Sequence, residues 1–139
     1  MVDAVEAFFD SFLEKFNANQ IEALHKLYDE PVVWIQPIGT RVFPERAEFA
    51  KQMESLRLLY AQNGMAATRK RVLQVTNYGV GLHMADLAWS HFRSDGQLLA
   101  EIKTTYILRE VEDGFLISAH ISHNEMFQRP LGGGVGTPE

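Results

Sequence analysis

Residues 80–124 read VGLHMADLAWSHFRSDGQLLAEIKTTYILREVEDGFLISAHISHN, and this stretch decides the fold. Apolar and polar residues come close to alternating along it, which is typical of β-strands with one buried face. Asp-Gly pairs at 95–96 and 113–114 interrupt the alternation and favour tight hairpin turns. Together with the residues just before it, the stretch predicts an antiparallel meander of four strands, over 66–76, 80–92, 98–110 and 115–124.

The first part of the chain predicts three helices and a short hairpin ahead of this meander. Apolar residues recur every three or four positions over 2–16, and a shorter helix is predicted over 21–28. Residues 32–43 predict two short strands. Pro44 suits the first position of a third helix, whose predicted buried side chains are Phe49, Met53, Leu56 and Tyr60. Helices that precede an antiparallel sheet predict an α+β fold, here a curved, cone-shaped sheet with three helices packed on its concave face.

The composition predicts one globular domain that binds neither nucleic acid nor membranes. The chain has 139 residues, no cysteine and a formal charge of -5 at pH 7. A negative surface repels phosphate backbones and anionic lipids. The lack of cysteine removes disulfides, thiolate metal sites and thiol nucleophiles. We expect a single domain over 1–128, a Gly/Pro-rich tail over 129–139 and a cytoplasmic location.

Strand alternation sorts the side chains of the meander into two faces. The turn at 95–96 would pair Ala85 with Tyr106, and the turn at 113–114 would pair Tyr106 with Ile121. The more apolar face is predicted to point toward the helices. Combined with the first strand and the helices, it gives the expected lining of an internal cavity: Phe12, Phe16, Trp34, Gln36, Met53, Tyr60, His83, Trp89, Thr104, Tyr106 and His123.

The opposite face carries most of the polar side chains, and we expect it to be the outer surface of the sheet. Asp86, His120 and Ser122 belong to it. His120 and His123 are three residues apart on one strand, so they would point to opposite faces and could not share a metal ion. The inner face is aromatic with few polar groups, a composition that suits small organic molecules. We therefore expect a small hydrophobic or aromatic ligand, without a metal or a cofactor.

Two segments resemble a known family. Residues 27–39 read LYDEPVVWIQPIG, at the passage from the second helix into the first strand, and residues 113–122 read DGFLISAHIS. Both resemble the corresponding segments of the nuclear transport factor 2-like (NTF2-like) superfamily, in the branch that holds the ketosteroid isomerases and the SnoaL-like polyketide cyclases. The resemblance covers about residues 2–126. It implies a cone with an internal pocket, and homodimers formed through the outer face of the sheet.

The residues that the isomerases use in catalysis are mostly replaced in this chain. Gln36, before Pro37 and Gly39, stands where those enzymes carry the aspartate base, and glutamine has no titrating group. Phe12 stands at the position of the first-helix tyrosine that donates to the oxyanion. Tyr106 falls at or near the position of the second donor. The resemblance therefore does not imply ketosteroid isomerase activity here.

Two functional hypotheses remain open from the sequence. Tyr106 as a hydrogen-bond donor, with His83 or His123 as a base, would suit a cofactor-free isomerase, dehydratase or cyclase. The alternative is a non-catalytic module that binds a ligand or associates as a homodimer, which the loss of the isomerase residues favours. The two hypotheses differ in whether a bound molecule is converted.

Overall fold

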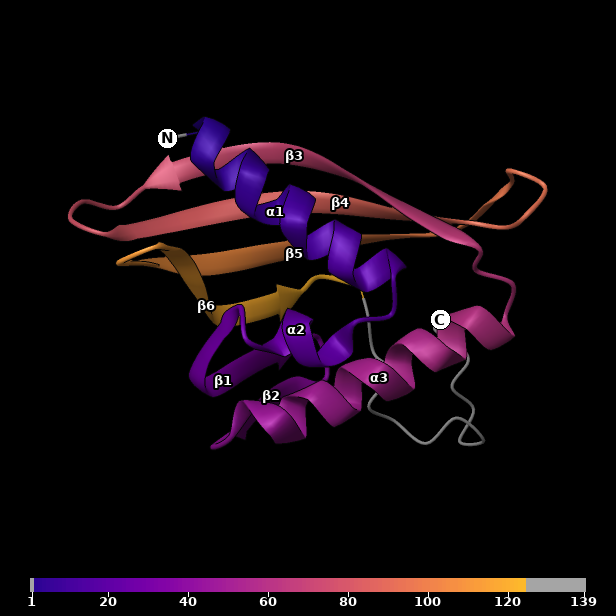
Figure 1. The fold of residues 1–139 in the computed structure, drawn as a ribbon, viewed down its shortest axis with the longest axis horizontal. Coiled ribbons are helices and arrows are strands. Elements are labelled where there is room, and N and C mark those ends of the chain that lie inside the picture. The colour runs from indigo at the N-terminus through magenta and orange to yellow at the C-terminus, as the bar shows by residue number, and fades with distance from the viewer. Residues whose placement is uncertain (1, 125–139) are drawn as a thin grey trace.

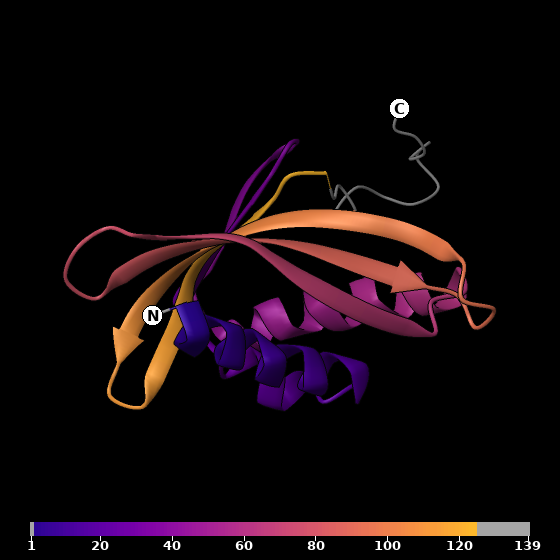
Figure 2. The ribbon, with the colours of Figure 1, turned by 90° about the horizontal axis from the view of Figure 1, so that it is seen from above.

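A curved sheet of six strands carries three helices on its concave side in the computed structural model, which describes residues 2–124 (Figures 1 and 2). The predicted α+β fold is confirmed, and the predicted tail over 129–139 lies outside the described residues. None of the described helices is both long and apolar enough to cross a membrane. The elements in chain order are α1 (Val2–Asn17), α2 (Ile21–His25), β1 (Tyr28–Gln36), β2 (Gly39–Phe43), α3 (Arg46–Gln62), β3 (Ala67–Asn77), β4 (Leu82–Phe92), β5 (Leu98–Val111) and β6 (Gly114–Ser122).

The strands lie in the order β2-β1-β6-β5-β4-β3. The last four in the sequence form the predicted antiparallel meander. β1 pairs with β6 in parallel, so the sheet is mixed rather than wholly antiparallel. No hairpin connects these two strands, because β2, α3 and the rest of the meander separate them in the chain, and a hairpin is what would impose the antiparallel direction.

The second helix is shorter than the sequence predicts. It ends at His25, and Tyr28 begins β1 instead of completing the helix. Pro31, which was expected to stop the helix, lies inside β1. It falls between the paired residues Tyr28 and Val33 on the side of β6, where the register is irregular. Its missing N–H therefore removes no hydrogen bond of the sheet.

Aromatic side chains dominate the core between the helices and the sheet. α1 buries Phe9 and Phe12, and α3 buries Phe49, Met53 and Tyr60 as its apolar pattern predicts. The Phe9 ring centroid lies 4.8 Å from that of Tyr106 on β5, within the usual range of aromatic pairs. These contacts hold α1 against the concave face and make one wall of the internal space.

The predicted register between β4 and β5 is confirmed. Ala85 pairs with Tyr106, and Trp89 pairs with Ile102. A two-residue Asp-Gly turn was the basis of this prediction, and the observed register agrees with it along most of the two strands; it shifts only beside the turn, next to Phe92. The side chains of β4 and β5 consequently lie on the predicted faces.

The predicted register between β5 and β6 is wrong. Tyr106 pairs with His120 instead of Ile121. The turn sets Val111 opposite Gly114, two residues away from the register of an Asp113-Gly114 turn, and this shift alone would leave every side chain on its predicted face. Further along, β6 contains a β-bulge in which Ser118 is an extra residue. One extra residue moves all the following side chains to the other face of the sheet. The residues exchanged are His120 and Ser122, now inside the cone, and Ala119, Ile121 and His123, now outside.

Side chains from three strands hold the bulge in place. The Ser118 hydroxyl donates to Oδ2 of Asp29 over 3.1 Å. Nε and Nη2 of Arg109 donate to the two oxygens of the same carboxylate, each over 2.9 Å. Hydrogen bonds from Arg109 are the main cause of the lowered pKa of Asp29. The carboxylate thus ties β1, β5 and β6 together where the register changes.

Candidate functional site

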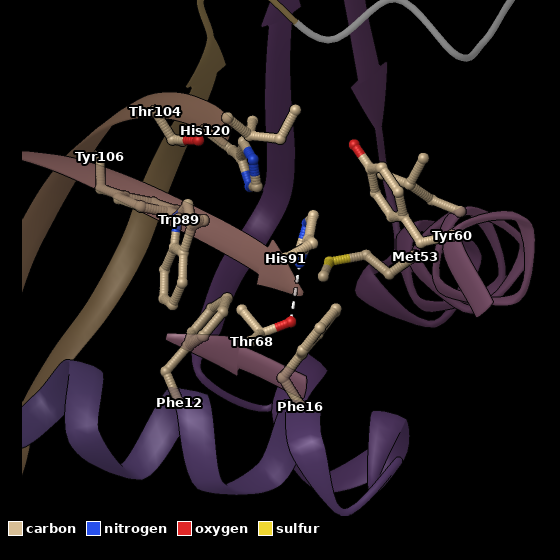
Figure 3. Close-up of a pocket in the computed structure, with 12 residues that line it drawn as sticks. Phe12, Phe16, Met53, Tyr60, Thr68, Trp89, His91, Thr104, Tyr106 and His120 are labelled. Carbon is tan, nitrogen blue, oxygen red and sulfur yellow. Dashed lines mark hydrogen bonds between the residues drawn. The ribbon is translucent and has the colours of Figure 1, made fainter. Parts of the chain in front are cut away.

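A cavity lies inside the cone, between α1, α3 and the inner face of the sheet (Figure 3). Its volume is about 50 Å³, and it is open to solvent on one side. Its lining residues are Phe12, Phe16, Met53, Leu56, Tyr60, Thr68, Trp89, His91, Ile102, Thr104, Tyr106 and His120.

Seven of the eleven residues named from the sequence lie together in this lining. The helices contribute theirs at the spacing of one helical face, and β4 and β5 contribute theirs at alternate positions. The confirmed register of β4 and β5 explains why the strand residues meet. The seven are Phe12, Phe16, Met53, Tyr60, Trp89, Thr104 and Tyr106.

Three others are buried but do not line the cavity. Trp34 packs against Phe49, and its indole N–H donates to Oγ of Ser122 over 3.0 Å. Gln36 is buried at the end of β1. His83 is near the start of β4, with Nε2 2.7 Å from the Glu110 carboxylate. These three side chains are buried outside the lining of the cavity.

His123 lies on the outer face, and its predicted place in the cavity is wrong. The bulge in β6 turns it outward. Its Nε2 is 2.7 Å from Oγ1 of Thr105, whose hydroxyl donates to the Asp86 carboxylate. Because neither His83 nor His123 lines the cavity, neither stands beside Tyr106 as the base that the sequence analysis considered.

The same bulge brings His120 into the cavity, where the sequence did not predict it. Nδ1 of His120 lies 2.8 Å from the hydroxyl oxygen of Tyr28, and its ring centroid lies 4.9 Å from that of Tyr106. Burial lowers the pKa of His120 from 6.5 to about 3. The imidazole is therefore neutral at pH 7.

His91 is the second histidine of the lining that was missed. Its Nδ1 lies 2.7 Å from Oγ1 of Thr68, and its ring packs 4.4 Å from that of Tyr60. Burial lowers its pKa to about 4, so it too is neutral at pH 7. The sequence could have predicted that His91 lines the cavity, because strand alternation places it on the same face as Trp89. His120 had no such signal, since the bulge reverses the alternation.

The lining combines apolar walls with a few neutral polar groups. Among the described residues, those that line the cavity include no Asp, Glu, Lys or Arg. The Tyr106 hydroxyl accepts a hydrogen bond from the Trp89 indole over 3.1 Å. Within residues 2–124 there is no group of three or more His, Cys, Asp or Glu that could hold a metal ion. Hydrogen bonding and proton transfer by neutral imidazole and phenol groups are the chemistry that these side chains offer.

Solved structures share this architecture at low sequence identity. An NTF2-like protein of unknown function from Shewanella oneidensis MR-1 has 14% identity and a TM-score of 0.72, covering 88% of this chain and 98% of its own. A ketosteroid isomerase-like protein from Erwinia carotovora atroseptica SCRI1043 has 15% identity and a TM-score of 0.60, covering 87% and 93%. A protein from Thiobacillus denitrificans ATCC 25259, named for the association domain of calcium/calmodulin-dependent protein kinase type II, has 16% identity and a TM-score of 0.68, covering 87% and 94%.

The sequence itself identifies the family. No curated protein matches it significantly. The family described as NTF2-like protein (DUF6841) matches residues 3–125, which is nearly the whole of the described structure. The structural likenesses agree with this match in fold. The chain therefore belongs to the NTF2-like superfamily, in the DUF6841 family.

Proposed function

We propose that this protein binds a small organic molecule with a single aromatic or alicyclic ring in the internal cavity. The carrying observation is the cavity itself, about 50 Å³ of free space walled by aromatic and aliphatic side chains with a few neutral polar groups. Concave apolar sites with a few polar groups are typical of ligand pockets. The small free volume favours one ring over a steroid-sized ligand.

A panel of single-ring compounds tests the proposal by thermal shift. A ligand at 100 times its Kd is expected to add about 2.7 kcal/mol of stability. Leu56→Phe enlarges a side chain of the lining and should abolish that gain. Leu58→Phe is the matched control, because Leu58 lies on the same helix and is 57% exposed. Loss of binding in both variants, or no hit across the panel, would contradict the proposal.

A catalytic version of this function has its own supporting observation. His120 and Tyr106, a neutral imidazole and a phenol, share the cavity with ring centroids 4.9 Å apart. Such a pair can donate hydrogen bonds to a substrate oxygen on which negative charge develops, as a cofactor-free isomerase, dehydratase or cyclase requires. Product analysis of the compounds that bind separates an enzyme from a binding protein. Turnover that Tyr106→Phe abolishes while binding persists would make it an enzyme.

We also propose that two copies associate through the outer face of the sheet. One row of paired residues crosses five strands there and is apolar throughout. The likeness to a protein named for an association domain supports the same use of the fold. The row consists of Val42, Val33, Ala119, Ile107 and Met84.

Replacing Ile107 by lysine is expected to convert the dimer into a monomer. A charge in the middle of the apolar row would lose its hydration on association, which is unfavourable without a partner. Sedimentation velocity of both forms measures the result. Val80→Lys, at an exposed position in the turn between β3 and β4, should stay dimeric. A wild-type protein that is monomeric at high micromolar concentration would refute the association.

A further inference from the structure

We propose that His120, oriented by Tyr28, makes the cavity selective for uncharged ring compounds that carry a carbonyl oxygen. This inference rests on the proposed ligand binding and names the chemical class of the ligand. Tyr28 is a positioning residue in it, and His120 is the group that contacts the ligand. Three observations carry the inference, namely the charges of the lining, the hydrogen bond between these two residues, and the aromatic packing around His120.

The lining disfavours an ionised ligand. The residues around the cavity, as far as the structure describes them, include no cationic side chain that could pair with a carboxylate. Both histidines of the lining are neutral at pH 7. A carboxylate entering this site would lose its hydration without gaining an opposite charge, which is strongly unfavourable. A neutral ring compound incurs no such penalty.

The hydrogen bond to Tyr28 decides which nitrogen of His120 carries the proton. Nδ1 lies 2.8 Å from the Tyr28 hydroxyl oxygen, and both side chains are buried. A phenol is a stronger donor than a neutral imidazole N–H, and an imidazole nitrogen is a stronger acceptor than a phenol oxygen. The hydroxyl therefore donates to Nδ1, and the imidazole proton is on Nε2.

Nε2 is left available for a ligand. None of the described residues forms a hydrogen bond with it, and His120 belongs to the lining of the cavity (Figure 3). As an N–H group it can donate to a carbonyl oxygen, which has lone pairs to accept it. An ether or an alkyl group in the same place would make a weaker contact or none.

Aromatic neighbours fix the direction of this donor. The rings of Tyr28 and His120 are nearly parallel, at 13°, with centroids 6.0 Å apart. Tyr106 meets the imidazole edge-on at 4.9 Å, and Trp34 lies 5.8 Å away. A donor held in place before the ligand arrives loses little conformational entropy on binding. This preorganisation makes the Nε2–H group a determinant of specificity.

Three probes with the same ring test the selectivity: toluene, 4-methylacetophenone and p-toluate. The ketone and the carboxylate have nearly the same shape and differ in charge. At pH 7, NMR titration is expected to show the ketone binding about tenfold tighter than toluene, the amount that one hydrogen bond contributes. p-Toluate is expected to bind at least tenfold more weakly than the ketone. Equal affinities for all three probes would overturn the selectivity alone, whereas no binding of any probe would also overturn the proposed function.

Variants of the two residues separate their roles. His120→Phe should bring the ketone down to the affinity of toluene, with toluene binding unchanged. Tyr28→Phe should weaken ketone binding several-fold and leave toluene unaffected, and long-range ¹H–¹⁵N spectra should show that the His120 proton is no longer confined to Nε2. Tyr78→Phe, at an exposed tyrosine that contacts Met84, is the matched control and should change none of these results. A proton on Nδ1 of His120 in the wild-type spectra would overturn the assigned role of Tyr28.

Discussion

Acidification from pH 8 to pH 5 is expected to lower the free energy of unfolding by about 4 kcal/mol. Burial lowers the pKa of His91 to about 4 and that of His120 to about 3, from an ordinary value of 6.5. Below pH 6.5 the unfolded chain binds a proton at each histidine while the folded chain does not, so stability falls as the pH falls. For each histidine the free energy of unfolding falls by ~1.4 kcal/mol per pH unit below 6.5, which makes the loss ~2 kcal/mol at pH 5. Urea denaturation followed by tryptophan fluorescence measures the difference.

Two substitutions assign this pH dependence to its residues. His91→Gln and His120→Asn keep an amide in place of the ring and remove the titrating group, so each should remove about half of the loss. Asp29 does not contribute to the change between pH 8 and pH 5. Its pKa is lowered in the folded protein, so the stability that its carboxylate provides is lost only below about pH 4. A pH dependence that both variants retain in full would show that the two histidines are not buried as neutral groups.

Replacing Phe9 by alanine is expected to destabilise the protein by about 3–5 kcal/mol. Phe9 is 0% exposed, and its ring packs against Phe12 and Tyr106 with centroid distances of 5.8 and 4.8 Å. Truncation removes the transfer energy of the ring and leaves a hole between α1 and the sheet. Domains of this size have total stabilities of about 5–15 kcal/mol, so much of the margin is lost. Thermal and urea unfolding provide the measurement.

An exposed leucine is the control for this truncation. Leu58→Ala, on the outer side of α3, should change the stability by less than about 0.5 kcal/mol, because the side chain is 57% exposed. If Phe9→Ala cost no more than this control, α1 would not pack on the concave face as the structure shows. The ligand-binding proposal would then lose one wall of its cavity.

Much of the fold could be predicted because it depends on local pattern. The apolar spacing of α3 identified Phe49, Met53 and Tyr60 as buried, and the Asp-Gly turn at 95–96 set the register of β4 and β5. The parallel pairing of β1 with β6 had no comparable signal. It joins strands from distant parts of the chain, and nothing between them dictates their relative direction.

The residues of the candidate site likewise fall into those that local pattern predicts and those that it does not. Phe12, Phe16, Trp89 and Tyr106 were placed by helical and strand periodicity, and His91 follows from the same alternation once Trp89 is known to face inward. His120 does not, since Ile-Ser-Ala-His-Ile-Ser alternates as if its apolar residues faced the core. The bulge at Ser118 reverses that order halfway along the strand.

The amino-acid sequence by itself determined the class of fold and the aromatic character of the interior, because both depend on residue type and short-range spacing. Only the tertiary structure decided that His120, and not His123, lines the cavity. That outcome depends on a single extra residue in β6, which Asp29 and Arg109 hold in place from two other strands. A bulge stabilised by side chains distant in sequence leaves no periodic trace, yet it moves every following side chain across the sheet.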